Sequence, residues 1–148
     1  MRKNKFRAWD KEFNRMVFQH DVNLALEHKE YLFSLSEEGV ELLHYDEDYS
    51  AYVKCDAELM QYTGLKDKNS KEIYEGDIVR KIIDGENRGI GKIVYKNCGF
   101  KIHILDPYFE FYSELTDIYK VEDMGGTIEL KQSFEIIGNI YEDSDLLK

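Results

Sequence analysis

The chain has 148 residues, of which 43% are hydrophobic and 14% aromatic, so it has enough apolar material for a packed core and is not an intrinsically disordered chain. Its formal net charge of −10 excludes a protein that coats bulk nucleic acid or an anionic membrane, since both partners attract net positive charge. No run approaches the roughly 18 apolar residues that a membrane helix requires, and the basic N-terminus leads into no apolar stretch, so we expect no membrane span and no secretory signal.

The first part of the chain carries two hairpin patterns. Residues 5–9 alternate polar and apolar side chains and are followed by a polar loop and the apolar run 16–18, which predicts a β-hairpin. Residues 32–35 and 40–43 flank a polar turn and predict a second one. Between the hairpins, a helix capped by Asp21 is predicted over residues 21–30. We therefore expect residues 1–58 to form an N-terminal β-rich region with a variable insertion.

Short strands and tight turns follow from residue 75 onward. The apolar runs 78–83, 90–95 and 100–105 are separated by polar turns, and the last of them alternates with period 2, which places His103 on a solvent-facing side. Asp106-Pro107 offers a helix cap and a first-turn proline before Tyr108, Phe111, Tyr112 and Leu115 at helical spacing, which predicts a short helix.

Two final strands are predicted over residues 127–130 and 134–141, the second with a bulge or a close backbone approach at Gly138. Five short strands joined mostly by tight turns predict a small antiparallel barrel, so the fold class is mainly β with one or two short helices. A barrel with edge strands that carry little charge also predicts a homo-oligomer, because an unpaired edge must be covered, charged or paired.

The centre and both ends of the chain carry a family signature. The central run spells LMQYTGLKDKN over residues 59–69 and KEIYEGDIV over 71–79, with KFRAWD at 5–10 and EIIGNIYE at 135–142. In this order the segments resemble the YopX family. Residues 21–55 and 106–131 match no part of that pattern, and Ser70 stands where the pattern has a glycine.

The resemblance implies a protein encoded by a phage or a prophage of Gram-positive bacteria. It also implies a small SH3-like barrel in residues 59–148, or one YopX-like domain overall, and no established activity, catalytic residue or ligand. Read physically, Leu65, Ile73, Ile78 and Val79 belong to the core, and Gly64 and Gly76 stand where φ is positive or a backbone passes closely.

Local motifs for catalytic or metal chemistry are missing. Residues 67–78 have part of the spacing of a calcium loop, but Glu72 replaces its glycine and Ile78 its bidentate glutamate, which excludes an EF-hand. Cys55, Cys98 and the four histidines show no metal-ligand or nucleophile spacing, so we expect no metal, no cofactor and no enzyme. Two distant cysteines fit a reducing cytoplasm.

Two function classes remain open. The first is a non-enzymatic protein-interaction or scaffold module that binds an unknown phage or host protein, favoured by 11 tyrosines and 8 phenylalanines. The alternative is a nucleic-acid-binding small barrel, in which Lys81, Lys92 and Lys101 add charge and tyrosines stack on bases. Acidic segments flank these lysines, so nucleic-acid binding is expected to be weak and salt-sensitive. The candidate interaction surface consists of Tyr62, Lys66, Lys68, Lys71, Tyr74 and Arg80.

Overall fold

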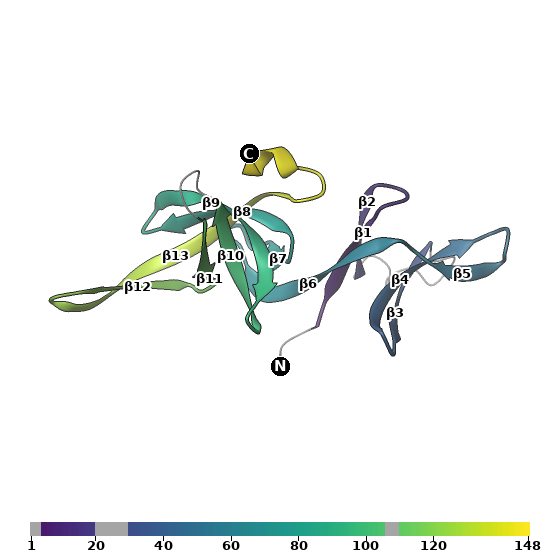
Figure 1. Ribbon diagram of the computed structural model, residues 1–148, viewed down its shortest axis with the longest axis horizontal. Helices are drawn as coiled ribbons and strands as arrows, with labels where there is room; N and C mark the ends of the chain where they lie inside the picture. The colour runs from purple at the N-terminus through teal and green to yellow at the C-terminus, as the bar shows by residue number, and fades with distance from the viewer. Residues whose placement is uncertain (1–3, 20–29, 106–109) are drawn as a thin grey trace. The chain divides into compact units, whose positions relative to one another are not determined.

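The computed structural model describes residues 4–19, 30–105 and 110–148, and the chain divides into two compact units, Met1–Tyr62 and Thr63–Lys148 (Figure 1). The boundary predicted from sequence, between residues 58 and 59, falls inside strand β6 (Ala57–Lys66). This strand belongs to both units: its first half pairs with a strand of the first unit, and β7 (Glu72–Tyr74) lies next to it in the second.

The first unit contains the two predicted hairpins, which are both confirmed. β1 (Phe6–Asp10) pairs with β2 (Arg15–Phe18) and also with β6. β3 (Tyr31–Ser36) and β4 (Gly39–Asp46) form the second hairpin, and β5 (Ala51–Lys54), which the sequence did not predict, extends it to three strands. The helix predicted over residues 21–30 lies, apart from Glu30, outside the described residues.

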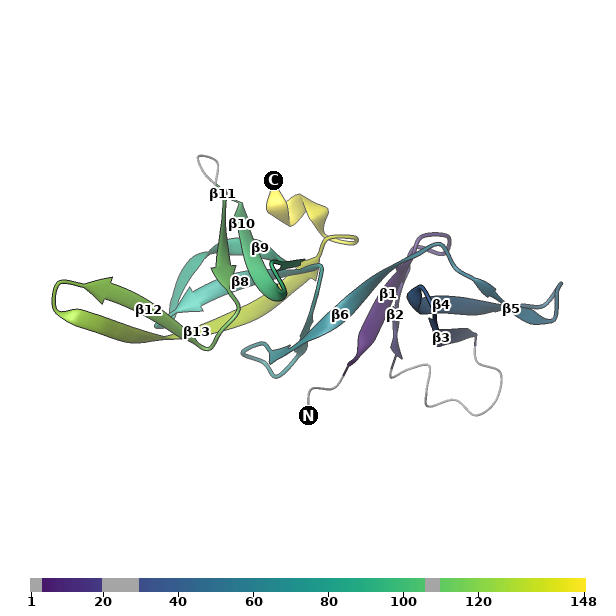
Figure 2. The same ribbon diagram turned by 60° about the horizontal axis from the view of Figure 1, so that its bottom comes forward.

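The second unit is a curled antiparallel sheet of six strands in the order β11-β10-β9-β8-β13-β12 (Figure 2). Its strands are β8 (Asp77–Ile83), β9 (Glu86–Lys96), β10 (Gly99–Leu105), β11 (Glu110–Glu114), β12 (Ile118–Asp123) and β13 (Gly126–Asn139). A 3-10 turn, Ser144–Leu147, follows β13. The mainly β class is confirmed, whereas the narrower SH3-like description stays a prediction. In the part of the chain that the structure describes, no helix is long and apolar enough to cross a membrane.

The core of the second unit lies against the inner face of this sheet. Val79, Ile93, Ile102 and Phe134 are fully or almost fully buried there together with Ile73 of β7. The predicted core positions Ile73, Ile78 and Val79 are thus confirmed, and Leu65 packs partly buried against the same cluster. Burial of these apolar side chains is the main stabilising contribution to this unit, because removing apolar area from water is the dominant favourable term in folding.

The structure contradicts two predictions, one for the helix after Pro107 and one for the exposure of His103. Residues 110–114 form strand β11 where the spacing predicted a helix, because the backbone of β10 offers a pairing edge and aromatic residues suit strands well. His103 is buried where the alternation placed it in solvent. The ring of Tyr112, the residue opposite it on β11, stacks on the imidazole with a centroid distance of 4.4 Å and covers that face.

The two strands predicted over residues 127–130 and 134–141 are one strand of 14 residues, β13. Gln132, which lies between the two predicted strands, is buried, and its side-chain amide donates to the carbonyl oxygen of Thr116 at 2.6 Å. The predicted irregularity at Gly138 is confirmed, since the pairing with β8 shifts between Ile136 and Gly138.

Candidate functional site

The signature loop of residues 66–71 is built around the carboxylate of Asp67. Its Oδ1 accepts the backbone N–H groups of Asn69 at 2.8 Å and Lys71 at 2.9 Å, and its Oδ2 accepts the N–H of Ile136 at 3.2 Å. The backbone N–H of Lys68 donates a hydrogen bond of 2.8 Å to the carbonyl oxygen of Phe134, which attaches the same loop to β13. The residues with part of the calcium-loop spacing therefore form a turn. In this turn both oxygens of the Asp67 carboxylate accept hydrogen bonds from backbone N–H groups.

Ser70 stands in this turn with a φ of 66°, in the left-handed region that costs an L-residue about 1 kcal/mol or more. This explains physically why a glycine suits the position. We expect Ser70→Gly to raise the free energy of unfolding by about 0.5 kcal/mol, after the greater backbone entropy of glycine is subtracted. Urea denaturation measures the change. Lys71→Gly, at a neighbouring position without positive φ, is the control and should lower stability instead.

The predicted interaction surface divides into buried tyrosines and exposed cations. Tyr62 and Tyr74 are buried, so their rings are not presented to a partner or to a base. Lys66, Lys68 and Lys71 are exposed, and Arg80 is half-buried. Lys68 at 2.9 Å and Arg80 at 2.5 Å both contact the carboxylate of Glu135, and the hydrogen bond from Lys68 is the larger of their two effects in lowering the pKa of that carboxyl group. Two of the four cations are therefore already paired.

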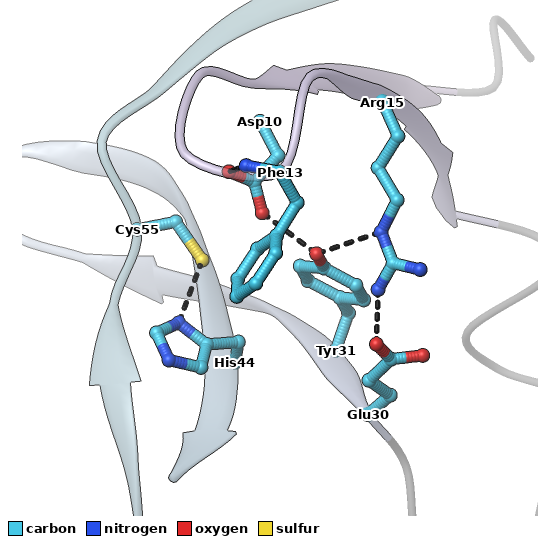
Figure 3. Close-up of polar contacts among 7 residues, drawn as sticks. All are labelled: Asp10, Phe13, Arg15, Glu30, Tyr31, His44 and Cys55. Carbon is cyan, nitrogen blue, oxygen red and sulfur yellow. Dashed lines mark hydrogen bonds and ion pairs between the residues drawn. The ribbon is translucent and has the colours of Figure 1, made fainter.

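A polar network in the first unit brings together ionisable side chains that sequence reasoning missed (Figure 3). The hydroxyl of Tyr31 donates to the buried carboxylate of Asp10 at 2.7 Å and accepts from Nε of Arg15 at 2.9 Å, while Arg15 also pairs with Glu30. Burial, and then the bond to Asp10, raise the pKa of Tyr31 far above its usual value. A protonated tyrosine that donates to a carboxylate ties β3 to the β1–β2 hairpin, and its role is structural.

Beside this network, Sγ of Cys55 lies 3.4 Å from Nδ1 of His44 (Figure 3). No local spacing connects this pair, which the fold assembles from β4 and the link between β5 and β6. Burial, reinforced by the nearby carboxylate of Asp10, raises the pKa of the Cys55 thiol to about 11. A nucleophilic cysteine requires the opposite shift, because the thiolate is the reactive form. Among the described residues, no group of three His, Cys, Asp or Glu side chains is placed to hold a metal ion.

We expect the two thiols to differ strongly in reactivity. With a pKa of about 11, Cys55 carries about 100-fold less thiolate near neutral pH than a thiol of pKa 9.0, and burial slows it further. Cys98 is exposed. Alkylation followed by peptide mass spectrometry should label Cys98 first, and the rate at Cys55 should keep rising with pH up to about 11. Equal labelling rates at pH 8 would contradict the described environment of Cys55.

A buried lysine lies on the inner face of the second unit. Lys81 of β8 is 4% exposed; its Nζ donates to the hydroxyl of Ser113 at 2.7 Å and lies 4.7 Å from the ring centroid of Tyr119. Burial lowers the pKa of this ammonium group. Gln132 donates a hydrogen bond to Thr116 in the segment between β11 and β12. Together, Lys81 and Gln132 attach this part of the chain to the middle of the sheet. Lys81 therefore links strands β8 and β11 inside the unit and is not presented to phosphates.

The hairpin of β12 and β13 over residues 118–131, here called the arm, extends beyond the rest of its sheet (Figures 1 and 2). One face carries apolar side chains, since Tyr119 is opposite Leu130 and Val121 is opposite Ile128. The other face carries charges, including the ion pair of Lys120 and Glu129 at 3.0 Å. Tyr119, Val121 and Ile128 are 37%, 36% and 48% exposed, so the apolar face is uncovered. The alternation of apolar and charged residues over 119–122 is the sequence signal that could have revealed it.

Comparisons with known proteins found one family and similar solved structures. The family model described as YopX protein matches residues 5–148. The crystal structure of protein yopX from Bacillus subtilis resembles the chain with a TM-score of 0.58 and 17% sequence identity, and the match covers 100% of each chain. The crystal structure of protein EF1440 from Enterococcus faecalis matches with a TM-score of 0.49 and 24% identity, also over 100% of each chain. No curated protein matches the sequence.

Proposed function

From the premise that the chain belongs to the YopX family, we propose that it is a non-enzymatic protein-interaction module of a phage or prophage programme, which binds its partner through the apolar face of the arm. The observation that carries this proposal is the uncovered row of Tyr119, Val121 and Ile128, next to the half-buried Leu130, on a two-stranded hairpin. An isolated hairpin is marginally stable in water, and an apolar face gains free energy when a partner covers it.

Side-chain contacts fix the base of the arm to the sheet, as is expected of a hairpin that binds a partner. Lys81 contacts Tyr119, and Gln132 holds Thr116, so both ends of the segment that enters β12 are tied to the sheet. The inner face continues along β13 from the buried Phe134 to the exposed Ile128, because alternate residues of a strand share one face. A partner that covers the arm would therefore extend the hydrophobic core of the second unit.

The environments of the ionisable groups support a role without catalysis. The thiol of Cys55 and the hydroxyl of Tyr31 both have raised pKa values and are protonated at neutral pH. The only other buried side chain with a lowered or raised pKa among the described residues is Lys81, whose ammonium group already donates to Ser113. Each of these groups is engaged in holding strands together.

A position-specific cross-linking experiment tests the proposal. A photoreactive amino acid at Ile128 probes the apolar face, and the same group at Thr127, the preceding residue on the charged face, is the matched control. In the source bacterium we expect protein adducts from position 128 and few from position 127, and Ile128→Lys should abolish recovery of the same partner. Equal adducts from both positions, or none from either, would contradict the proposal.

The alternative, a nucleic-acid-binding barrel, receives less support from the geometry. Of its proposed residues, Tyr62, Tyr74 and Lys81 are buried. Lys68 and Arg80 share Glu135, and Lys101 pairs with Glu114. One observation still favours nucleic-acid binding: Tyr95, a proposed stacking residue, is 56% exposed beside the ring of Phe100. Few phosphates could be neutralised by the cations left, so nucleic-acid binding should fall steeply with salt.

A further inference from the structure

We infer that the outer edge of β12 pairs with β12 of a second copy of this chain, in an antiparallel register centred on Val121. Within the described residues, β12 is the last strand of the six-stranded sheet, so no strand pairs with its outer edge. The inference concerns this edge, whereas the proposed function concerns the apolar face of the same arm, so either can fail without the other.

The backbone determines which residues can pair at this edge. The carbonyl oxygen of Asp117 accepts the N–H of Gln132 at 2.8 Å, which continues the ladder between β12 and β13. Hydrogen-bonding direction alternates along a strand, so residues 119, 121 and 123 bond to β13 and residues 118, 120 and 122 direct their N–H and C=O groups outward. The outward set therefore includes Lys120 and Glu122, which also share the charged face.

Charge complementarity then favours one register. Two identical antiparallel strands related by a two-fold axis perpendicular to the sheet are centred on one residue, since opposite residues must share a face. Centring on Val121 places Lys120 opposite Glu122 of the second copy, and Glu122 opposite Lys120 of the second copy. Centring on residue 120 or on residue 122 would instead place two lysines or two glutamates opposite each other.

A lysine in an edge strand usually prevents strand pairing. Here Glu122 lies two residues later on the same face, and in the register centred on Val121 it is opposite Lys120 of the second copy. Lys120 is therefore attracted in this register and unpaired or repelled in the others. The arm itself is close to neutral, because Lys120 and Lys131 stand against Glu122, Asp123 and Glu129. Two arms can approach without the repulsion that a net charge of −10 produces between whole chains.

The apolar side of the pairing is also self-complementary. Val121 and Val121 of the second copy would form a non-hydrogen-bonded pair, in which Cα atoms lie about 4.5 Å apart and side chains pack closely. The two apolar faces would join into a four-stranded surface with Tyr119 and Ile128 of both copies. Pairing at the edge thus enlarges the face that the proposed function assigns to another protein.

Charge reversal tests the register. Lys120→Glu and Glu122→Lys each replace two attractive cross-strand pairs by two repulsive ones, so each variant should associate about 30-fold more weakly than the unchanged chain. The double variant K120E/E122K should regain association, and an equimolar mixture of the two single variants should form mixed dimers. Sedimentation equilibrium at up to about 100 μM measures these affinities, because association depends on concentration.

A second double variant separates pairing between chains from the stability of the arm. Lys120 also pairs with Glu129 of its own arm, so K120E alone weakens the hairpin. K120E/E129K restores that internal pair but leaves glutamates opposite each other between chains, and it should remain weakly associating. Rescue by E129K, no rescue by E122K, or a single species of 17.5 kDa for the unchanged chain at about 100 μM would overturn the inference.

Covalent trapping provides an independent readout. In a Cys98→Ser background, Val121→Cys should form an intermolecular disulfide on mild oxidation, because a non-hydrogen-bonded pair brings the two Cβ atoms within disulfide range. Thr127→Cys lies on β13, away from the edge, and should not cross-link. Equal cross-linking at both positions would contradict the register. Cross-links from Ile128 to another protein, without a disulfide at position 121, would support the proposed function and exclude pairing at the edge.

Discussion

Replacing Gly91 with alanine is expected to lower the free energy of unfolding of the second unit by about 4 kcal/mol. A Cβ at this position would lie 2.5 Å from the carbonyl oxygen of His103 and 2.9 Å from Cγ1 of Ile102. The first of these atoms belongs to the backbone of β10, the strand that pairs with β9, so the clash can be relieved only if the two strands move apart. Core residues Ile93 and Ile102 lie at this pairing and would lose contacts as well.

Gly99→Ala is the matched control. Gly99 begins β10 in the same strand pair, but a Cβ there would meet nothing within 4 Å, and its φ is not positive. We expect its stability to change by at most about 0.5 kcal/mol, with a small gain from the reduced entropy of the unfolded chain. Urea denaturation, with hydrogen exchange at Ile93 and Ile102 as a local measure, compares the two variants. Equal stability of both would show that β9 and β10 are not packed at the described distance.

Gly91 also shows where sequence reasoning stops. In the sequence it is part of Gly89-Ile90-Gly91, a pattern that lacks the third glycine and the helix of a phosphate loop and so indicates almost nothing. Its importance lies in a contact with a residue of the next strand, and a single sequence does not show how closely two strands approach. By contrast, the prediction that Gly64 and Gly76 stand at positive φ or at a close backbone approach is confirmed, since their φ values are 91° and 80°.

The same distinction explains the other outcomes. Alternation over residues 100–104 correctly predicted a strand, since period 2 is local, but the burial of His103 depends on Tyr112 of β11. The helix after Pro107 was mispredicted because helical spacing and strand pairing compete, and the exposed edge of β10 decided the outcome. The contact of Cys55 with His44 joins residues that no local motif connects.

The candidate surfaces could be predicted only in part. Lys66, Lys68 and Lys71 are exposed as the polar turn suggested, whereas the burial of Tyr62 and Tyr74, whose rings the sequence predicts to pack, removes both from the predicted interaction surface. The arm was missed because Thr127–Leu130 was read as a short separate strand and its partner β12 was not assigned. A hairpin that projects from a sheet has no sequence signal beyond alternation, and alternation alone does not say whether its apolar face is covered.

Replacing Asp67 with alanine is expected to lower the free energy of unfolding by about 3 kcal/mol, because a buried acceptor of three backbone N–H groups is lost. The N–H groups of Asn69 and Lys71 would be left inside the turn, and that of Ile136 at its junction with β13. Asp67→Asn should cost less, since one oxygen remains, although its amide group would then face a donor on one side.

Asp46→Ala is the comparison for Asp67→Ala, because Asp46 makes the same kind of turn in an exposed place. Its Oδ1 accepts the N–H groups of Asp48 at 2.9 Å and Tyr49 at 3.2 Å, where water can replace it. We therefore expect a loss of at most about 1 kcal/mol there. Urea denaturation gives both values, and hydrogen exchange at the amides of Asn69 and Lys71 should increase only in the Asp67 variants. If Asp67→Ala cost no more than Asp46→Ala, the signature loop would not depend on its carboxylate, and the three short N–H contacts would have little energetic importance.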